Sequence, residues 1–159
     1  MNRQAIYTSY LERFKKDLIA NYDKLGLRAS GSFADGLEYT VEKNKLTMYG
    51  SGHSIFMEYG RGSSSKFPPL KAIEEWIEVK RGLPAIFVEK KKQFAFIIAR
   101  KIAKEGIKVP NEHNKGKVIS DIVTLYMGEY LYRMLDEVGE EFMREVDFQS
   151  DFRNILKAA

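Results

Sequence analysis

The two histidines, His53 and His113, are the first candidates for metal-binding chemistry in this 159-residue sequence. They are far apart along the chain, and each lies in or beside a predicted loop. A helical metal site places a second ligand three or four residues from the first, and neither histidine has one. The sequence also has no cysteine, so it offers no thiolate ligand, disulfide or thiol nucleophile. We therefore expect no metal site and no cofactor.

Three carboxylates, Glu74, Glu75 and Glu78, gather early in a predicted helix. Negative charge is favoured there by the helix dipole, and Lys71 is spaced to pair with Glu75. Acid and base catalysis would additionally require a carboxylate desolvated in a pocket, for which the sequence holds no sign. We assign no catalytic residue and expect a protein that is not an enzyme.

An arginine between two glycines opens a segment that is rich in serine. The segment lacks the GxxxxGK[ST] and GxGxxG patterns, so it is not a phosphate loop. Its composition predicts a flexible loop. Arg61 is then either a bidentate ligand for a carboxylate or phosphate, or an ordinary exposed arginine. The predicted interaction loop comprises Gly60, Arg61, Gly62, Ser63, Ser64, Ser65 and Lys66.

The densest basic region follows this loop and could contact nucleic acid or a protein partner. No helix-turn-helix, zinc-finger or RNA-recognition signature accompanies it. The nearby aromatic residues Phe94 and Phe96 are expected on or beside the core face of a helix, and not on an exposed stacking platform. The candidate contact residues are Lys90, Lys91, Lys92, Arg100 and Lys104.

Charge is distributed unevenly along the chain, although its net value is only +4. Residues 61–117 carry 14 basic and 6 acidic side chains, whereas residues 118–159 carry 4 basic and 9 acidic ones. Such opposed fields can steer the middle of one molecule toward the tail of another, or toward an acidic partner such as nucleic acid. The alternative is that these charged side chains simply lie on solvent-exposed helix faces.

The length of 159 residues and the hydrophobic fraction of 44% predict one folded domain. The first twenty residues carry charges throughout and lack the apolar segment of a signal peptide. No segment approaches the roughly 18 apolar residues of a membrane span. We expect a soluble protein made in a cytoplasm, with no membrane partner.

Hydrophobic periodicity predicts the elements of the first half of the chain. Apolar residues at steps of three and four over residues 7–25 predict a long helix. Alternation over residues 37–49 predicts a hairpin that turns at Lys43 and Asn44. A third run rich in β-formers, residues 53–59, is expected to extend the hairpin into an antiparallel meander.

Helical patterns predict the second half. A helix that begins after Pro68-Pro69 is expected to bury Trp76 between helix and sheet. A longer helix is predicted over residues 87–105, in which alanines at every fourth position would admit a close neighbour. Another is predicted over residues 118–146, weakly interrupted by Gly128 and Gly139.

These elements together predict an α+β fold. A long N-terminal helix precedes a small antiparallel β-meander, and three helices then pack on the sheet. The chain is expected to form a single domain, residues 1–159. Within it, residues 1–117 would form the core and residues 118–159 an acidic helical C-terminal extension.

The order of elements and two motifs resemble the head-tail connector and tail-completion (neck) proteins of tailed bacteriophages. The likeness covers roughly residues 50–110. One motif is the acidic or aromatic residue before a Gly-Arg-Gly loop, here Glu58-Tyr59-Gly60-Arg61-Gly62. The other is the A-x-x-I-A-[RK]-x-I-x-x-x-G helix, here Ala95 to Gly106.

The resemblance implies a non-enzymatic virion protein that forms a homo-oligomeric ring in the neck or tail-completion region. Such a ring would join head to tail and contact other connector, portal-side or tail proteins, with DNA passing through its lumen. The protein would assemble in the bacterial cytoplasm and reside in the virion. The long acidic segment 118–159 departs from the family pattern and leaves open which neighbour it contacts.

Two hypotheses of different classes remain. The first is the structural connector, whose interaction loop would order on contact with a neighbouring subunit. The second is a small basic nucleic-acid-binding protein that uses the lysines and arginines of residues 90–108. Head-to-tail subunit contacts could use both the loop and the opposed charges, which favours the first.

Overall fold

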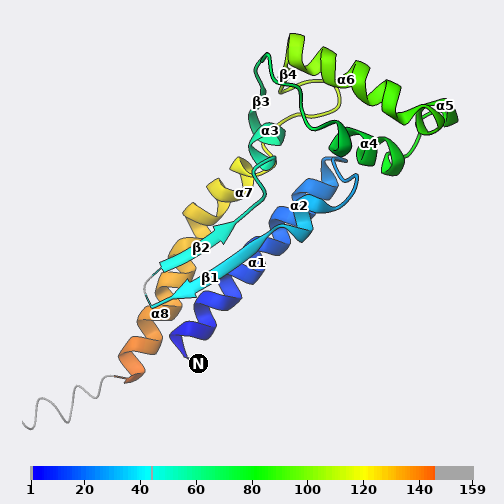
Figure 1. The fold of residues 1–159 in the computed structure, drawn as a ribbon. Coiled ribbons are helices and arrows are strands. Elements are labelled where there is room, and N and C mark those ends of the chain that lie inside the picture. Colours follow the sequence, from blue (N-terminus) through cyan, green and yellow to red (C-terminus); the bar gives the residue numbers. More distant parts are fainter. Residues whose placement is uncertain (1, 44, 146–159) are drawn as a thin grey trace, which may run out of the picture.

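The computed structural model describes residues 2–43 and 45–145. The chain forms an elongated molecule in which long helices lie side by side at one end and a second group of helices occupies the other (Figure 1). Within the described residues, no helix combines the length and the apolar character that crossing a membrane requires. The α+β class, the long first helix, the antiparallel sheet and the later helices are confirmed.

Helix α1 (Arg3–Lys24) forms the spine of the molecule. The side chain of Asn2 accepts a hydrogen bond from the Gln4 amide at 3.0 Å and so caps the start of the helix. Its inward face carries Leu18 and Tyr22, which pack with Phe33 of the short helix α2 (Ser32–Asp35). The segment 27–36 between α1 and the sheet therefore contains one helical turn that contributes to the core.

The predicted hairpin is present as β1 (Glu38–Glu42) and β2 (Lys45–Tyr49). The strands pair antiparallel with Val41 opposite Leu46, and the pairing closes at Glu42 and Lys45. The predicted turn residue Asn44 lies outside the described residues. The Gln4 side chain donates to the Val41 carbonyl at 3.0 Å, and the sheet packs against α1.

The predicted third strand over residues 53–59 is wrong, because this segment forms helix α3 (Ser54–Tyr59). The side chains that it buries are Ser54 and Glu58, four residues apart on one helical face. The β-formers face outward, with Ile55 60% and Tyr59 75% exposed. Tertiary contacts override the local β-propensity, since the helix brings the Glu58 carboxylate within hydrogen-bond distance of the amides of Ile119 and Ser120.

Helices α4 (Leu70–Val79), α5 (Ala85–Glu89) and α6 (Lys91–Glu105) form the second group. Helix α4 packs on α6, and Ile73 and Ile77 contact Ala95 and Ala99. The alanine repeat thus admits a close neighbour as predicted, and that neighbour is α4. The predicted helix 87–105 is divided at Lys90, whose backbone is non-helical.

These helices do not pack on the sheet as predicted. The cluster of α4 and α6 is separate from the cluster that α1 forms with residues such as Leu37 and Val118. The prediction that Trp76 lies in the core is also wrong, since its side chain is 38% exposed. On α4 the buried positions are Ile73 and Ile77, so the apolar stripe is narrower than the sequence pattern indicates.

The predicted helix 118–146 is a broken run that lies beside α1 (Figure 1). It consists of α7 (Ser120–Leu125), the π-helical turn η1 (Tyr126–Tyr130) and α8 (Leu131–Glu145). Gly128 has the non-helical angles φ −98° and ψ −116°, so the predicted interruption is present there, whereas Gly139 lies inside α8. Val118 packs with Leu18 and Tyr22 of α1, and residues 146–159 lie outside the described part.

Candidate interaction surface

The predicted interaction loop begins in regular structure. Gly60 and Arg61 form β3 (Gly60–Arg61), which pairs antiparallel with β4 (Ile107–Lys108). Gly60 is buried with φ +79°, and a Cβ atom there would overlap the Ile107 carbonyl oxygen. The glycine is therefore required for the close approach of two backbones, and not for mobility.

Hydrogen bonds also organise the rest of this loop, and one of them joins it to α6. The Arg61 guanidinium donates to the Lys66 carbonyl at 2.8 Å, and the Lys66 amide donates to the Ser64 hydroxyl at 3.1 Å. The Ser64 amide donates to the carbonyl of Ala103 at 2.8 Å. The predicted flexible loop therefore has hydrogen bonds of its own, and Arg61 closes the loop instead of reaching outward.

Glu58 of the same motif is a buried carboxylate, with 8% of its surface exposed. It accepts hydrogen bonds from the amides of Ile119 at 2.9 Å and Ser120 at 3.3 Å. These amides lie at the start of α7, where the first N–H groups of a helix have no partner within it. Glu58 thus caps a helix 61 residues later in the chain, a role that the sequence analysis missed. The four-residue spacing of Ser54 and Glu58 was the available signal.

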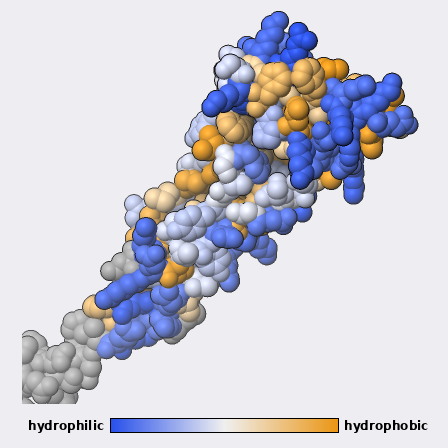
Figure 2. Space-filling view, in the orientation of Figure 1, coloured by the Kyte–Doolittle hydropathy of each residue, from blue (hydrophilic) through white to orange (hydrophobic). Residues whose placement is uncertain are grey.

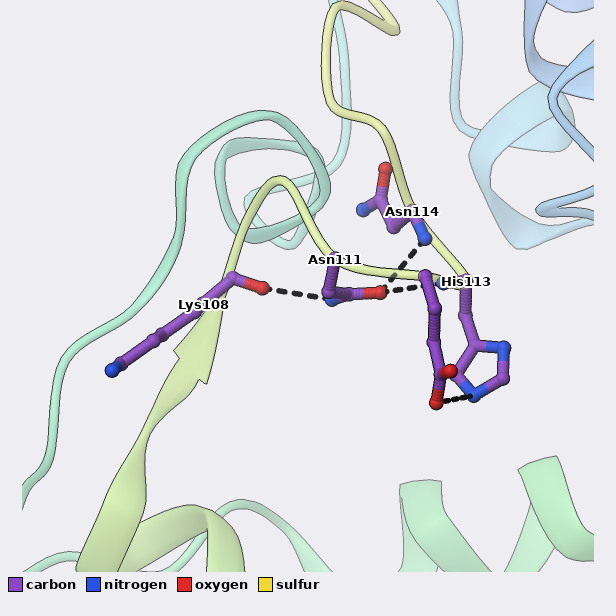
Figure 3. A network of polar contacts seen from close by, with 5 residues as sticks. Lys108, Asn111, His113 and Asn114 are labelled. Carbon is purple, nitrogen blue, oxygen red and sulfur yellow. Dashed lines mark hydrogen bonds and ion pairs between the residues drawn. The ribbon is translucent and has the colours of Figure 1, made fainter.

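The loop after β4 is organised by Asn111 (Figure 3). Its side-chain oxygen accepts from the amides of His113 and Asn114, each at 2.8 Å, and its amide group donates to the Lys108 carbonyl at 2.7 Å. Asn114 in turn donates to the Met57 carbonyl at 2.8 Å and fastens the loop to α3. These bonds fix the position of β4 opposite β3.

Both histidines lie on the surface. The Nε2 atom of His113 is 3.0 Å from the carboxylate of its exposed neighbour Glu112 (Figure 3), and His53 shares a hydrogen bond with the Ser51 hydroxyl. Among residues 2–43 and 45–145, no three His, Asp or Glu side chains form a group that could hold a metal ion. The titratable side chains assemble no metal centre in this part of the chain.

The five candidate basic residues do not form one surface. Lys91 forms an ion pair with Glu78 of α4, and this hydrogen bond, together with the charge of Glu78, raises the pKa of Lys91. Lys90 marks the break between α5 and α6, and Lys92 lies one helical turn before Phe96. Arg100 and Lys104 lie further along α6. Lys91 is therefore engaged with α4, whereas Arg100 and Lys104 lie two or more helical turns beyond Lys92.

Arg100 and Lys104 meet the interaction loop in a shallow groove of about 390 Å³. Two aromatic rings, Phe67 and Phe96, line it with their centroids 5.7 Å apart. The expectation that Phe96 lies on or beside the core face, and not on an exposed surface, is wrong, because the side chain is 48% exposed. The fully buried positions on α6 are alanines. Larger side chains such as Phe94 and Ile98 are partly buried beside them, and Phe96 lies on the exposed side. The groove is completed by Ser64, Ser65 and Ala103.

Comparisons of the chain with protein-family models, with curated proteins and with solved structures found no match in any of the three. The geometry above is therefore the basis for assigning a function. It contains surfaces suited to contacts with other macromolecules: the outward apolar side of α3 and the basic, aromatic groove of α6. The sequence-based candidates contributed Ser64, Ser65, Arg100 and Lys104 to the second of these.

Proposed function

We propose that this chain is a structural subunit of a tailed-bacteriophage virion that forms a ring in the neck or tail-completion region and joins head to tail. DNA would pass through the lumen of the ring. The protein would act without catalysis, through contacts with its own copies and with neighbouring connector, portal-side or tail proteins. The Gly-Arg-Gly and alanine-helix motifs of the sequence support this proposal.

The observation that carries the proposal is the inverted burial of α3. This helix buries Ser54 and Glu58, while Ile55, Phe56 and Tyr59 face outward. The apolar surface over α3 and α7 interrupts the polar exterior (Figure 2). Contiguous exposed apolar surface marks interaction sites in soluble proteins. A neighbouring subunit bound to this apolar surface would remove it from water. The Glu58 carboxylate would stay bonded to the amides of Ile119 and Ser120 at the start of α7.

Location in the virion is the decisive test. Cryo-microscopy of purified virions, with mass spectrometry of their proteins, should place the chain as a ring between portal and tail tube. Virions that lack this protein in both measurements would refute the proposal. A phage in which the gene is deleted should accumulate separate filled heads and tails, and a plasmid copy of the gene should restore joined particles.

A second candidate, a nucleic-acid-binding protein, is favoured by one observation. The α6 groove places Phe67 and Phe96 beside Arg100 and Lys104, which combines stacking surfaces with positive charge. Fluorescence anisotropy with a single-stranded oligonucleotide tests it. For specific use of the groove, affinity should fall steeply with salt, and Phe96→Ala should weaken it more than Phe56→Ala, a matched change on α3. Equal loss in both variants would count against this function.

A further inference from the structure

Helix α6 has one buried face and one face that is exposed apart from the ring contact between Phe96 and Phe67. The buried face carries Ala95, Ala99 and Ala103. On the opposite face, Phe96 and Ile97 are exposed among the basic residues Arg100, Lys101 and Lys104. An apolar centre bordered by charges of one sign is the arrangement found in interfaces, where an apolar core lies inside a polar rim.

Helix α8 has the same organisation with the opposite charge. Its inner face contacts α1, where Met134 is buried. Its outer face exposes Tyr132, Leu135 and Met143, with Asp136 exposed among them and Glu140 at the border. Tyrosine and methionine are enriched in protein interfaces, and this face places both on one side of a regular helix.

The charges of the two helices are complementary. Helix α6 carries five basic residues and one acidic residue, whereas α8 carries five acidic and two basic ones. Complementary charge steers two surfaces together and sets which surfaces pair. The apolar residues of both faces then supply area that association removes from water. Each helix has 15 residues, so the two faces are also matched in length.

The two helices lie at opposite ends of the elongated molecule (Figure 1). Helix α8 is fixed along α1, and α6 is fixed on α4. The faces therefore cannot meet within one molecule, and both carry exposed apolar side chains among the residues that the structure describes. We propose that the Phe96–Lys104 face of α6 in one copy docks on the Tyr132–Met143 face of α8 in the next copy.

This contact is heterologous, because two different surfaces meet. Repetition of such a contact closes into a ring when the rotation per copy divides the circle, and otherwise continues as a filament. The inference rests on the proposed ring and names the surfaces that build it. It assigns the opposed charges of the chain to one interface, with Phe96 and Ile97 facing Tyr132, Leu135 and Met143.

Charge exchange tests the contact. One variant reverses the α6 face, Arg100→Glu with Lys104→Glu, and another reverses the α8 face, Asp136→Lys with Glu140→Lys. Sedimentation velocity of the wild-type chain should show self-association that weakens as salt rises from about 0.1 M to about 1 M, where charges are screened beyond about 3 Å. Each variant alone should lose about tenfold or more in association constant. The two variants mixed, or combined in one chain, should regain it.

Matched controls separate the interface from net charge. Lys80→Glu with Arg81→Glu changes net charge as the α6 variant does, and Glu38→Lys with Glu42→Lys matches the α8 variant, all at exposed positions elsewhere. Both controls should associate as the wild type does. If a reversed variant fails to fold by circular dichroism, the milder Lys104→Gln and Asp136→Asn should each weaken association. A wild-type chain that stays monomeric, or folded reversed variants that associate normally or fail to recover when mixed, would overturn the inference.

The outcomes also distinguish this inference from the function on which it rests. If the protein is found in the neck of virions but its charge-exchange variants still assemble, the proposed function stands and the α6 to α8 contact is refuted. If the protein is absent from virions but the two charge-exchange variants rescue each other, the contact stands and the assignment to the neck is refuted. If the reversed α6 face abolishes oligonucleotide binding and leaves self-association intact, that face belongs to nucleic acid and the inference is wrong.

Discussion

The phenolic hydroxyl of Tyr126 donates a hydrogen bond to the carboxylate of Asp17, with 2.6 Å between the two oxygen atoms. The two residues are 109 positions apart and join η1 to α1. The Tyr10 hydroxyl donates to the Tyr126 carbonyl at 2.7 Å, and Arg13 lies over the ring of Tyr130 at 4.4 Å. These contacts fasten the C-terminal helical run to the first helix at the bend that Gly128 introduces.

Replacing Tyr126 by phenylalanine should lower the free energy of unfolding by about 1 to 2 kcal/mol, because a hydrogen bond to a charged group is lost while the ring remains. Urea denaturation measures the change. Tyr59→Phe, which removes the same hydroxyl from an exposed residue of α3, is the control and should be nearly neutral. Indistinguishable midpoints for all three proteins would mean that the Asp17 contact contributes nothing.

The same hydrogen bond should lose its effect at alkaline pH. Burial, and then the hydrogen bond to Asp17, raise the pKa of Tyr126 well above its ordinary value of about 10. A raised pKa stabilises the fold fully below about pH 10, and this stabilisation is lost as the pH rises toward the folded-state pKa. The midpoint difference between wild type and Tyr126→Phe should therefore narrow from about pH 8 to about pH 11. A constant difference would contradict this assignment.

Removal of the Glu58 carboxylate should destabilise the protein far from its own position in sequence. Glu58→Ala leaves the amides of Ile119 and Ser120 without their acceptor, at a cost of about 1 to 3 kcal/mol. Hydrogen exchange should show loss of protection at the start of α7. Glu58→Gln, which keeps an acceptor oxygen, should cost less, and Glu38→Ala on the exposed strand serves as the control. Unchanged exchange in α7 would disprove the capping role.

Two glycines two positions apart in sequence, Gly60 and Gly62, should respond differently to alanine. At Gly60, positive φ and the backbone of Ile107 leave no space for a Cβ atom, so Gly60→Ala should cost more than about 1 kcal/mol. At Gly62 nothing lies within 4 Å of the corresponding Cβ, and Gly62→Ala should be close to neutral. Thermal melts of the two variants compare them directly. Equal melting temperatures would show that the β3 and β4 pairing does not need a glycine.

On α4, truncation of the smaller residue should be the more damaging change. Ile77 is fully buried against Ala95 and Ala99, so Ile77→Ala should cost about 2 to 5 kcal/mol. Trp76 is partly exposed, so Trp76→Ala should lower the free energy of unfolding by less than Ile77→Ala does, although the side chain removed is larger. Chemical denaturation of both variants measures the order. A larger loss of stability for Trp76→Ala would contradict this prediction and indicate that Trp76 contributes to the core.

Local patterns were sufficient for several elements. Helix α1 follows from the spacing of Leu11, Leu18 and Tyr22, and the hairpin from the alternation that places Val41 opposite Leu46. In both, the apolar positions recur with the period of the element itself, so the pattern identifies the element without its tertiary neighbours. Segment 53–59 misled the prediction because its β-formers face solvent and its carboxylate is buried. The groove at Phe96 was missed for a related reason, since the buried face of α6 is lined by alanines.

The sequence by itself determined the α+β class, the first helix, the hairpin, the restart of helix after Pro69 and the opposition of charge between the middle and the tail. Each depends on residues close together in the chain or on a simple count. Only the tertiary structure decided that Glu58 turns inward to cap α7, that Gly60 permits two backbones to touch, and that α6 and α8 stand at opposite ends. Such features depend on pairs of residues far apart in sequence, and no local pattern contains their partners.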